Sequence, residues 1–106
     1  MATNTVPDDT TGVGRFPAAL PIDIPYCSRL NWELGTHIVD GEDTERLFEW
    51  HAESGWELTA FPVASRTLVV RFRTPIGREL FYTAEISIRS TVRERLELAA
   101  GWQRVD

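Results

Sequence analysis

The sequence predicts a small α+β domain in which two helices pack on a mainly antiparallel sheet of four or five strands, in the order β-α-β-β-β-α-β, behind an extended N-terminal arm. Three observations favour this fold class. Segments with period-two apolar alternation recur after residue 27, two stretches with helix caps and a terminal glycine separate them, and the first 26 residues show neither pattern. We therefore divide the 106 residues into an arm, 1–26, and a single domain, 27–106.

The arm has two parts with different compositions. Residues 1–14 are Thr, Asp, Pro and Gly with almost nothing apolar, which is typical of a flexible tail. Residues 15–26 contain a proline at every fourth position from 17 to 25, which favours an extended and stiff backbone. Its large apolar side chains predict that this segment docks, either on a partner protein or on its own sheet: Phe16, Leu20, Ile22, Ile24 and Tyr26.

The first strand and the first helix are expected between residues 30 and 54. Large apolar residues alternate with polar ones over 30–38, which predicts a strand. After an Asp-Gly turn at 40–41, Thr44 can cap a helix over 44–54. Gly55 would then take the left-handed conformation that commonly follows a helix.

Three further strands are expected over residues 56–61, 67–74 and 78–86. The turn between the last two contains Pro75 and Gly77, which predicts a three-residue loop. This loop sets a register in which the core-facing side chains oppose one another, namely Phe72 with Leu80, Val70 with Tyr82, and Leu68 with Ala84.

The C-terminal part predicts a helix followed by a short strand. Ser90 or Thr91 can cap the helix, and Thr91 with Glu94 has the spacing of a capping box. Gly101 would end the helix, and residues 102–105 would form the last strand. This strand or the arm can pair within the chain or across a homo-oligomer.

Composition limits the classes of partner. The net charge of −5 at pH 7 disfavours nucleic acid and anionic lipid, and all 11 basic residues are Arg, which is typical of a GC-rich bacterium or its phage. The single Cys27 forms no internal disulfide and favours a cytoplasmic protein. No apolar run is long enough to span a membrane.

Candidate catalytic chemistry is sparse. The two histidines, His37 and His51, lack the spacing of a zinc site, and no phosphate-binding loop is present, so we expect neither a metal nor another cofactor. Glu33, His37 and Glu57 could converge for acid-base chemistry if their strands are neighbours. Polar residues on the outer face of a one-sided sheet are equally expected without any catalysis.

Arginines gather around the hairpin at 74–78. Arg71 and Arg73 could contact phosphate while Phe81 stacks on a base. The predicted register offers an alternative, in which Arg73 pairs with Glu79 and Arg71 lies over Phe81 as a cation-π pair.

Residues 30–75 resemble a family of small bacterial and phage proteins whose function is unknown. The residues that carry the resemblance are Trp32-Glu33, Asp40-Gly41, Ala52-Glu53-Ser54-Gly55-Trp56-Glu57-Leu58 and Phe72-Arg73-Thr74-Pro75. The resemblance implies a strand, helix, strand, strand unit and no particular activity.

These observations favour a non-enzymatic accessory subunit, or a small bacterial or phage assembly component, that docks on a larger protein. Its contacts would come from the arm and the exposed sheet face: Phe16, Leu20, Ile22, Ile24, Tyr26, Arg71, Arg73 and Phe81. One alternative is a ligand-binding or enzymatic domain that uses Glu33, His37 and Glu57. The other is a nucleic-acid binder that uses the arginine-rich hairpin.

Overall fold

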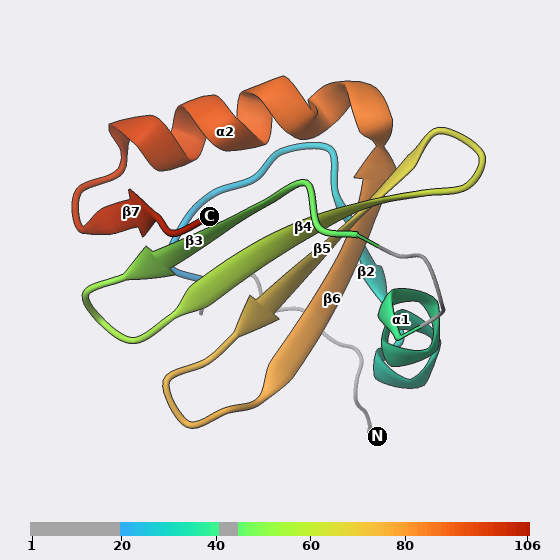
Figure 1. Cartoon of the computed structure of the whole chain (residues 1–106), viewed down its shortest axis with the longest axis horizontal. Helices are drawn as coiled ribbons and strands as arrows, with labels where there is room; N and C mark the ends of the chain where they lie inside the picture. The colour runs from blue at the N-terminus through green and yellow to red at the C-terminus, as the bar shows by residue number, and fades with distance from the viewer. Residues whose placement is uncertain (1–19, 41–44) are drawn as a thin grey trace, which may run out of the picture.

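The protein is an α+β domain built on one six-stranded antiparallel sheet (Figure 1). This computed structural model describes residues 20–40 and 45–106. The strands lie in the order β2-β6-β5-β4-β3-β7. Their bounds are β2 Ser28–Leu30, β3 Phe48–Ala52, β4 Glu57–Val63, β5 Thr67–Arg73, β6 Glu79–Glu85 and β7 Trp102–Arg104, and the helices are α1 Trp32–Val39, the short 3-10 helix η2 Ile86–Ile88, and α2 Arg89–Leu98.

The central hairpin, β5 with β6, has the predicted register. Phe72 lies opposite Leu80, and the other predicted pairs follow in step along both strands. The turn closes with a hydrogen bond of 2.8 Å from the backbone N–H of Thr74 to the carbonyl of Arg78. Gly77 has a φ of 92°, the left-handed conformation expected of it in this loop.

The prediction of a strand over residues 30–38 is wrong beyond Leu30, because α1 begins at Trp32. The side chain of Asn31 accepts a hydrogen bond of 3.1 Å from the backbone N–H of Leu34 and so caps the helix. Trp32 and Leu34 alternate as if in a strand, yet both are about half exposed, at 53% and 49%. Gly35, which carries no side chain, is the helix residue that lies closest to the sheet.

The prediction of a helix over residues 44–54 is also wrong. This segment contains β3, which pairs with β4 on one side and β7 on the other. Phe48 and Trp50 are buried in the core while Glu49 between them points to the other face, the period-two pattern of a strand. Gly55 does have a positive φ, 101°, but in the tight turn between β3 and β4. The sheet therefore has six strands rather than four or five.

The C-terminal helix and strand are confirmed, with a different helix start. η2 leads directly into α2 at Arg89, so Ser90 and Thr91 lie inside the helix and no side chain caps it. Val92 and Leu96 are fully buried, as the apolar stripe requires. Gly101, with a φ of 84°, then reverses the chain into β7.

One face of the sheet carries the main core. The buried side chains of β3 to β7 pack there against α2, which lies across the strands (Figure 1). Leu20, Ile22 and Ile24 of the arm pack against the same core. A bifurcated contact joins the arm to α2, since Arg95 Nη1 donates both to the carbonyl oxygen of Asp23 at 3.0 Å and to a carboxylate oxygen of Asp23 at 3.1 Å. The described part of the arm therefore docks on its own domain.

The opposite face of the sheet is only partly covered. There α1 packs over Phe61, Val69 and Phe81, with Leu30 and Ile38 at the margin. The remainder of this face, over β3, β4, β5 and the start of β6, carries polar side chains. Within the described ranges, no helix is both long and apolar enough to cross a membrane.

Candidate functional site

The part of the sheet that α1 leaves uncovered forms a patch that we name the charged face. Strand alternation and register place its side chains in two rows that run across the strands. One row contains His51, Glu57, Arg73 and Glu79, and the other contains Glu49, Thr59 and Arg71. The patch is therefore built on paired strands, which position side chains more precisely than loops do.

Arg73 is the centre of the first row. One of its guanidinium nitrogens donates to Glu57 at 3.1 Å and the other donates to Glu79 at 3.0 Å. The hydrogen bond to Glu79 is the largest influence on this guanidinium and raises the pKa of Arg73. The pairing of Arg73 with Glu79 was predicted from the hairpin register and is confirmed.

Arg71 occupies the second row and is more deeply set, with 20% of its side chain exposed. Burial is the largest influence on it and lowers its pKa, and Arg73 acts in the same direction. Its guanidinium donates to the Thr59 hydroxyl at 3.4 Å and lies 5.3 Å from the centre of the Phe61 ring. Arg71 was expected to lie over Phe81; that ring is in register with it but is fully buried.

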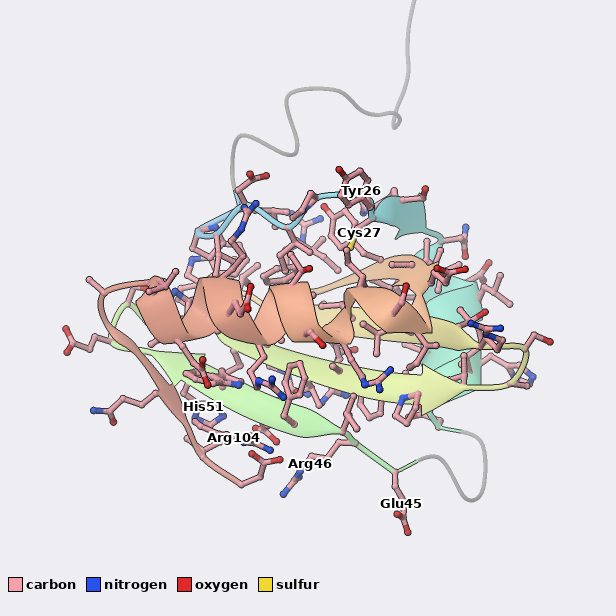
Figure 2. All side chains as sticks on the ribbon, turned by 90° about the horizontal axis from the view of Figure 1, so that it is seen from above. Tyr26, Cys27, Glu45, Arg46, His51 and Arg104 are labelled. Carbon is pink, nitrogen blue, oxygen red and sulfur yellow. The ribbon has the colours of Figure 1, made fainter. Side chains whose placement is uncertain are left out.

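His51 lies between a carboxylate of β3 and one of β4. In Figure 2 it is on the opposite side of the sheet from Tyr26 and Cys27. Its Nε2 atom lies 2.7 Å from a carboxylate oxygen of Glu49 and 3.9 Å from one of Glu57. Glu49 also pairs with Arg46 at 3.2 Å. Arg71 also lies 3.7 Å from a carboxylate oxygen of Glu79, so each Glu and Arg of the two rows has a partner of opposite charge.

Glu49, His51 and Glu57 could together hold a divalent cation, because their ligand atoms all lie within 4.8 Å of one another. Carboxylate oxygen and imidazole nitrogen are ligands that first-row divalent metals accept. In this arrangement, however, Arg46 and Arg73 already bind the two carboxylates and bring positive charge to the site. The geometry is therefore that of an ion-pair network.

The predicted grouping of Glu33, His37 and Glu57 is not formed. Glu33 and His37 lie on α1, because their segment is a helix rather than a strand, and both are exposed. Glu57 instead contacts Arg73 and lies beside His51. His51 was missed as a member of the site because its segment had been assigned to a helix, although Phe48 and Trp50 alternate with Glu49 and His51 in the sequence.

The residues expected to bind a partner fall into separate places. Leu20, Ile22 and Ile24 contact the domain's own core, whereas the Tyr26 side chain is 86% exposed. Phe16 lies outside the described residues. Phe81 is fully buried under α1 and offers no surface for stacking, which leaves Arg71 and Arg73 on the charged face.

Comparisons of the chain with protein-family models, with curated proteins and with solved structures found no match. The resemblance of residues 30–75 to small bacterial and phage proteins remains a prediction.

Proposed function

We propose that this protein is a non-enzymatic interaction module that binds a larger protein partner through the charged face. The observation that supports this most directly is the network centred on Arg73, in which the guanidinium is held by Glu57 on one side and Glu79 on the other. Side chains that are already fixed lose little conformational entropy when a partner binds. A fixed pattern of opposite charges also discriminates between partners.

The margin of the charged face has the composition of an interface. Strand alternation places Leu47 and Val105 on the same side as Glu49, and the backbone N–H of Val105 donates to the Glu49 carbonyl at 3.0 Å. Leu47 and Val105 are 36% and 47% exposed. Exposed aliphatic side chains beside partly buried arginines are features of protein-protein interfaces.

The mixture of charges favours a protein over a nucleic acid as the partner. Arg71 and Arg73 are the two guanidinium groups of the rows, and they are held among carboxylates that would repel a phosphate backbone. The net charge of −5 for the whole chain acts in the same direction. The arm is a weaker candidate for the docking element, because Leu20, Ile22 and Ile24 pack against the core and leave Tyr26 as its exposed large side chain among the described residues.

An exchange of charges within the face tests this proposal. In the double variant Glu57→Arg/Arg73→Glu the two exchanged side chains can still pair and the net charge is unchanged, but the charge pattern shown to a partner is reversed at these two positions. The carboxylate introduced at position 73 also replaces the ion pair with Glu79 by a like-charge contact. Tagged wild-type protein would be used to capture partners from a lysate of the source organism, and the captured protein would then be titrated against both forms. We expect the variant to bind at least tenfold more weakly. Its thermal unfolding midpoint should fall by no more than about 8 °C, the effect of losing roughly 1 kcal/mol with the ion pair to Glu79.

The matched control is Arg93→Glu/Glu97→Arg, which exchanges an exposed ion pair of α2 on the other side of the sheet. This control should bind the partner as wild type does. Equal binding by the wild-type protein and by the variant of the charged face would overturn the proposal. Loss of binding in the control alone would place the interface on α2 instead.

A further inference from the structure

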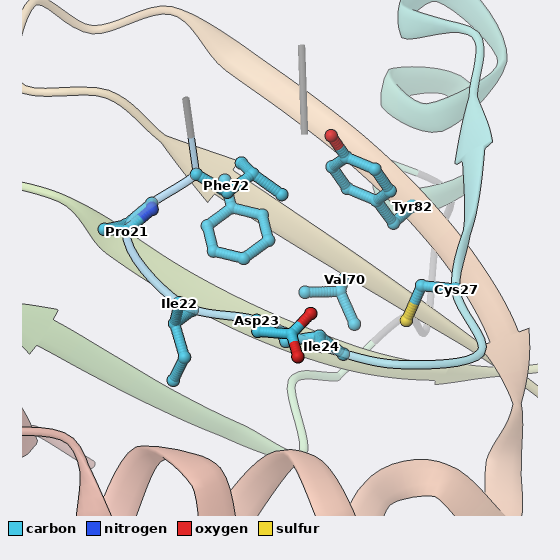
Figure 3. Close-up of a pocket in the computed structure, with 9 residues that line it drawn as sticks. Pro21, Ile22, Asp23, Ile24, Cys27, Val70, Phe72 and Tyr82 are labelled. Carbon is cyan, nitrogen blue, oxygen red and sulfur yellow. The ribbon is translucent and has the colours of Figure 1, made fainter. Parts of the chain in front are cut away.

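A cavity of about 420 Å³ lies between the arm and the core face of the sheet. In Figure 3 the arm crosses in front of β5 and β6, with Ile22, Asp23 and Ile24 on one side and Phe72 and Tyr82 on the other. Val70 and Cys27 also line the cavity. The volume falls within the roughly 300 to 1,000 Å³ of pockets that enclose small molecules.

One of the lining residues, Tyr82, carries a buried polar group that the described residues do not satisfy. The Tyr82 side chain is 8% exposed, and its hydroxyl has no hydrogen-bond partner among the described residues. In Figure 3 this hydroxyl lies at the end of the ring farthest from Cys27. A buried hydroxyl without a partner destabilises the folded state, so such groups in native proteins call for an explanation.

The remaining chemistry of the cavity favours an uncharged ligand. Its walls are mainly aliphatic and aromatic, and Phe72 and Tyr82 pack edge to face with ring centres 5.9 Å apart. Burial raises the pKa of the Cys27 thiol to about 11, and burial also raises the pKa of Tyr82, so both groups are neutral at physiological pH. The charged lining residue, Asp23, has its carboxylate turned outward to Arg95.

We propose that this cavity binds a small, neutral, mainly apolar molecule, and that the Tyr82 ring turns toward it so that the buried hydroxyl meets one oxygen atom of the ligand. The ligand would add apolar contacts to Val70 and Phe72 and would remove the cost of the unpaired hydroxyl. The arm forms the outer wall, and its contact with Arg95 holds that wall in place. This site is on the opposite side of the sheet from the charged face, so each can be tested without the other.

The probe for the test is 1-octanol, titrated into the full chain with labelled Ile, Leu and Val methyl groups and followed by NMR. We expect saturable shifts for the methyl groups of Leu20, Ile22, Ile24 and Val70. The methyl groups of Leu30 and Val63, which pack on the other face, should not move. Octanoate, which has the same chain and a negative charge, should not bind.

Tyr82→Phe removes the unpaired hydroxyl and gives the sharper comparison. The free variant should be at least as stable as wild type, because a buried unsatisfied group is lost. Its affinity for 1-octanol should fall about three- to tenfold, the effect of one neutral hydrogen bond. As a second variant, Ile22→Phe should fill the cavity and abolish binding, whereas Ile76→Phe in the exposed β5–β6 turn should not.

Two outcomes would overturn the proposal. One is the absence of saturable shifts for the cavity methyl groups up to the solubility of 1-octanol. The other is unchanged affinity in Tyr82→Phe, since the hydroxyl would then make no contact with the ligand. Neither outcome bears on binding of a protein by the charged face, because the variants of the two tests share no residue.

Discussion

Gly35 of α1 lies directly against the ring of Phe81 on β6. A β-carbon at position 35 would come within 2.7 Å of both Cδ atoms of that ring. The ring is fully buried and cannot move aside into solvent. The missing side chain is therefore what allows α1 to approach the sheet closely enough to seal this second, smaller core.

Gly35→Ala should destabilise the domain by about 1 to 3 kcal/mol, because a methyl group is forced into a closely packed site. Helix propensity alone predicts the opposite sign, a gain of about 1 kcal/mol. Urea unfolding would distinguish the two. The control is Glu33→Ala, at an exposed position of the same helix, which should change the free energy of unfolding by less than about 0.5 kcal/mol. Gly35→Ala should cost less in a Phe81→Leu background than in wild type, because the smaller side chain leaves room for the added methyl group. A Gly35→Ala variant more stable than wild type would contradict the contact.

Ile24→Ala and Tyr26→Ala test whether the arm is part of the domain's own core. Ile24 packs against the core and Tyr26 is 86% exposed, although only two positions separate them. Ile24→Ala should lower the free energy of unfolding by about 1 to 2 kcal/mol, since the side chain is only partly buried, and Tyr26→Ala should change it by less than about 0.5 kcal/mol. Equal stability of the two variants would show that the arm does not hold this position in solution.

The sequence predicted those elements in which turn chemistry and apolar pattern agree. For the β5–β6 hairpin, Pro75 and Gly77 restrict the loop, and only one register then places Phe72 opposite Leu80. The pairing of Arg73 with Glu79 follows from that register without further information. This half of the charged face was therefore predictable.

The other half was not predicted, because local signals conflict before Gly55. Trp32 and Leu34 alternate as in a strand, yet Asn31 caps a helix there and both side chains remain exposed. α1 is only 8 residues long, so its position depends on the contact of Gly35 with Phe81, which is distant in sequence. Assigning β3 to a helix then removed Glu49 and His51 from the predicted site.

The two ion pairs of Arg73 should make separable contributions to stability. Double-mutant cycles of Arg73→Ala with Glu79→Ala and with Glu57→Ala should each give a coupling of about 0.5 to 1 kcal/mol, because all three side chains are partly buried. The same cycle for Arg93 and Glu97, an exposed pair at 4.0 Å on α2, should give less than about 0.5 kcal/mol. Both couplings to Arg73 should shrink in 1 M NaCl. Couplings near zero would mean that the network does not fix its side chains, and would weaken the case for a preorganised face.

Cys27 should make the domain less stable at high pH. Burial raises the pKa of its thiol from 9.0 to about 11, so between these pH values the unfolded chain loses the proton while the folded chain keeps it. The unfolded state is then favoured, and the stabilisation that is complete below pH 9 is lost as the pH rises toward 11. Burial also raises the pKa of Tyr82, so ionisation of this phenol at high pH destabilises the folded state in the same way. The Cys27→Ala variant should therefore keep the loss of stability that is due to Tyr82 and lack the loss that is due to the thiol.

The measurement is the thiolate absorbance near 240 nm, recorded as the difference between wild type and Cys27→Ala so that ionised tyrosines cancel. Folded protein should titrate with a midpoint near pH 11, and protein in 8 M urea with a midpoint about two pH units lower. A folded midpoint at or below that of the unfolded chain would show that Cys27 is open to water. That result would mean that the arm does not stay packed on the core and on Arg95 in solution, and so does not cover the cavity.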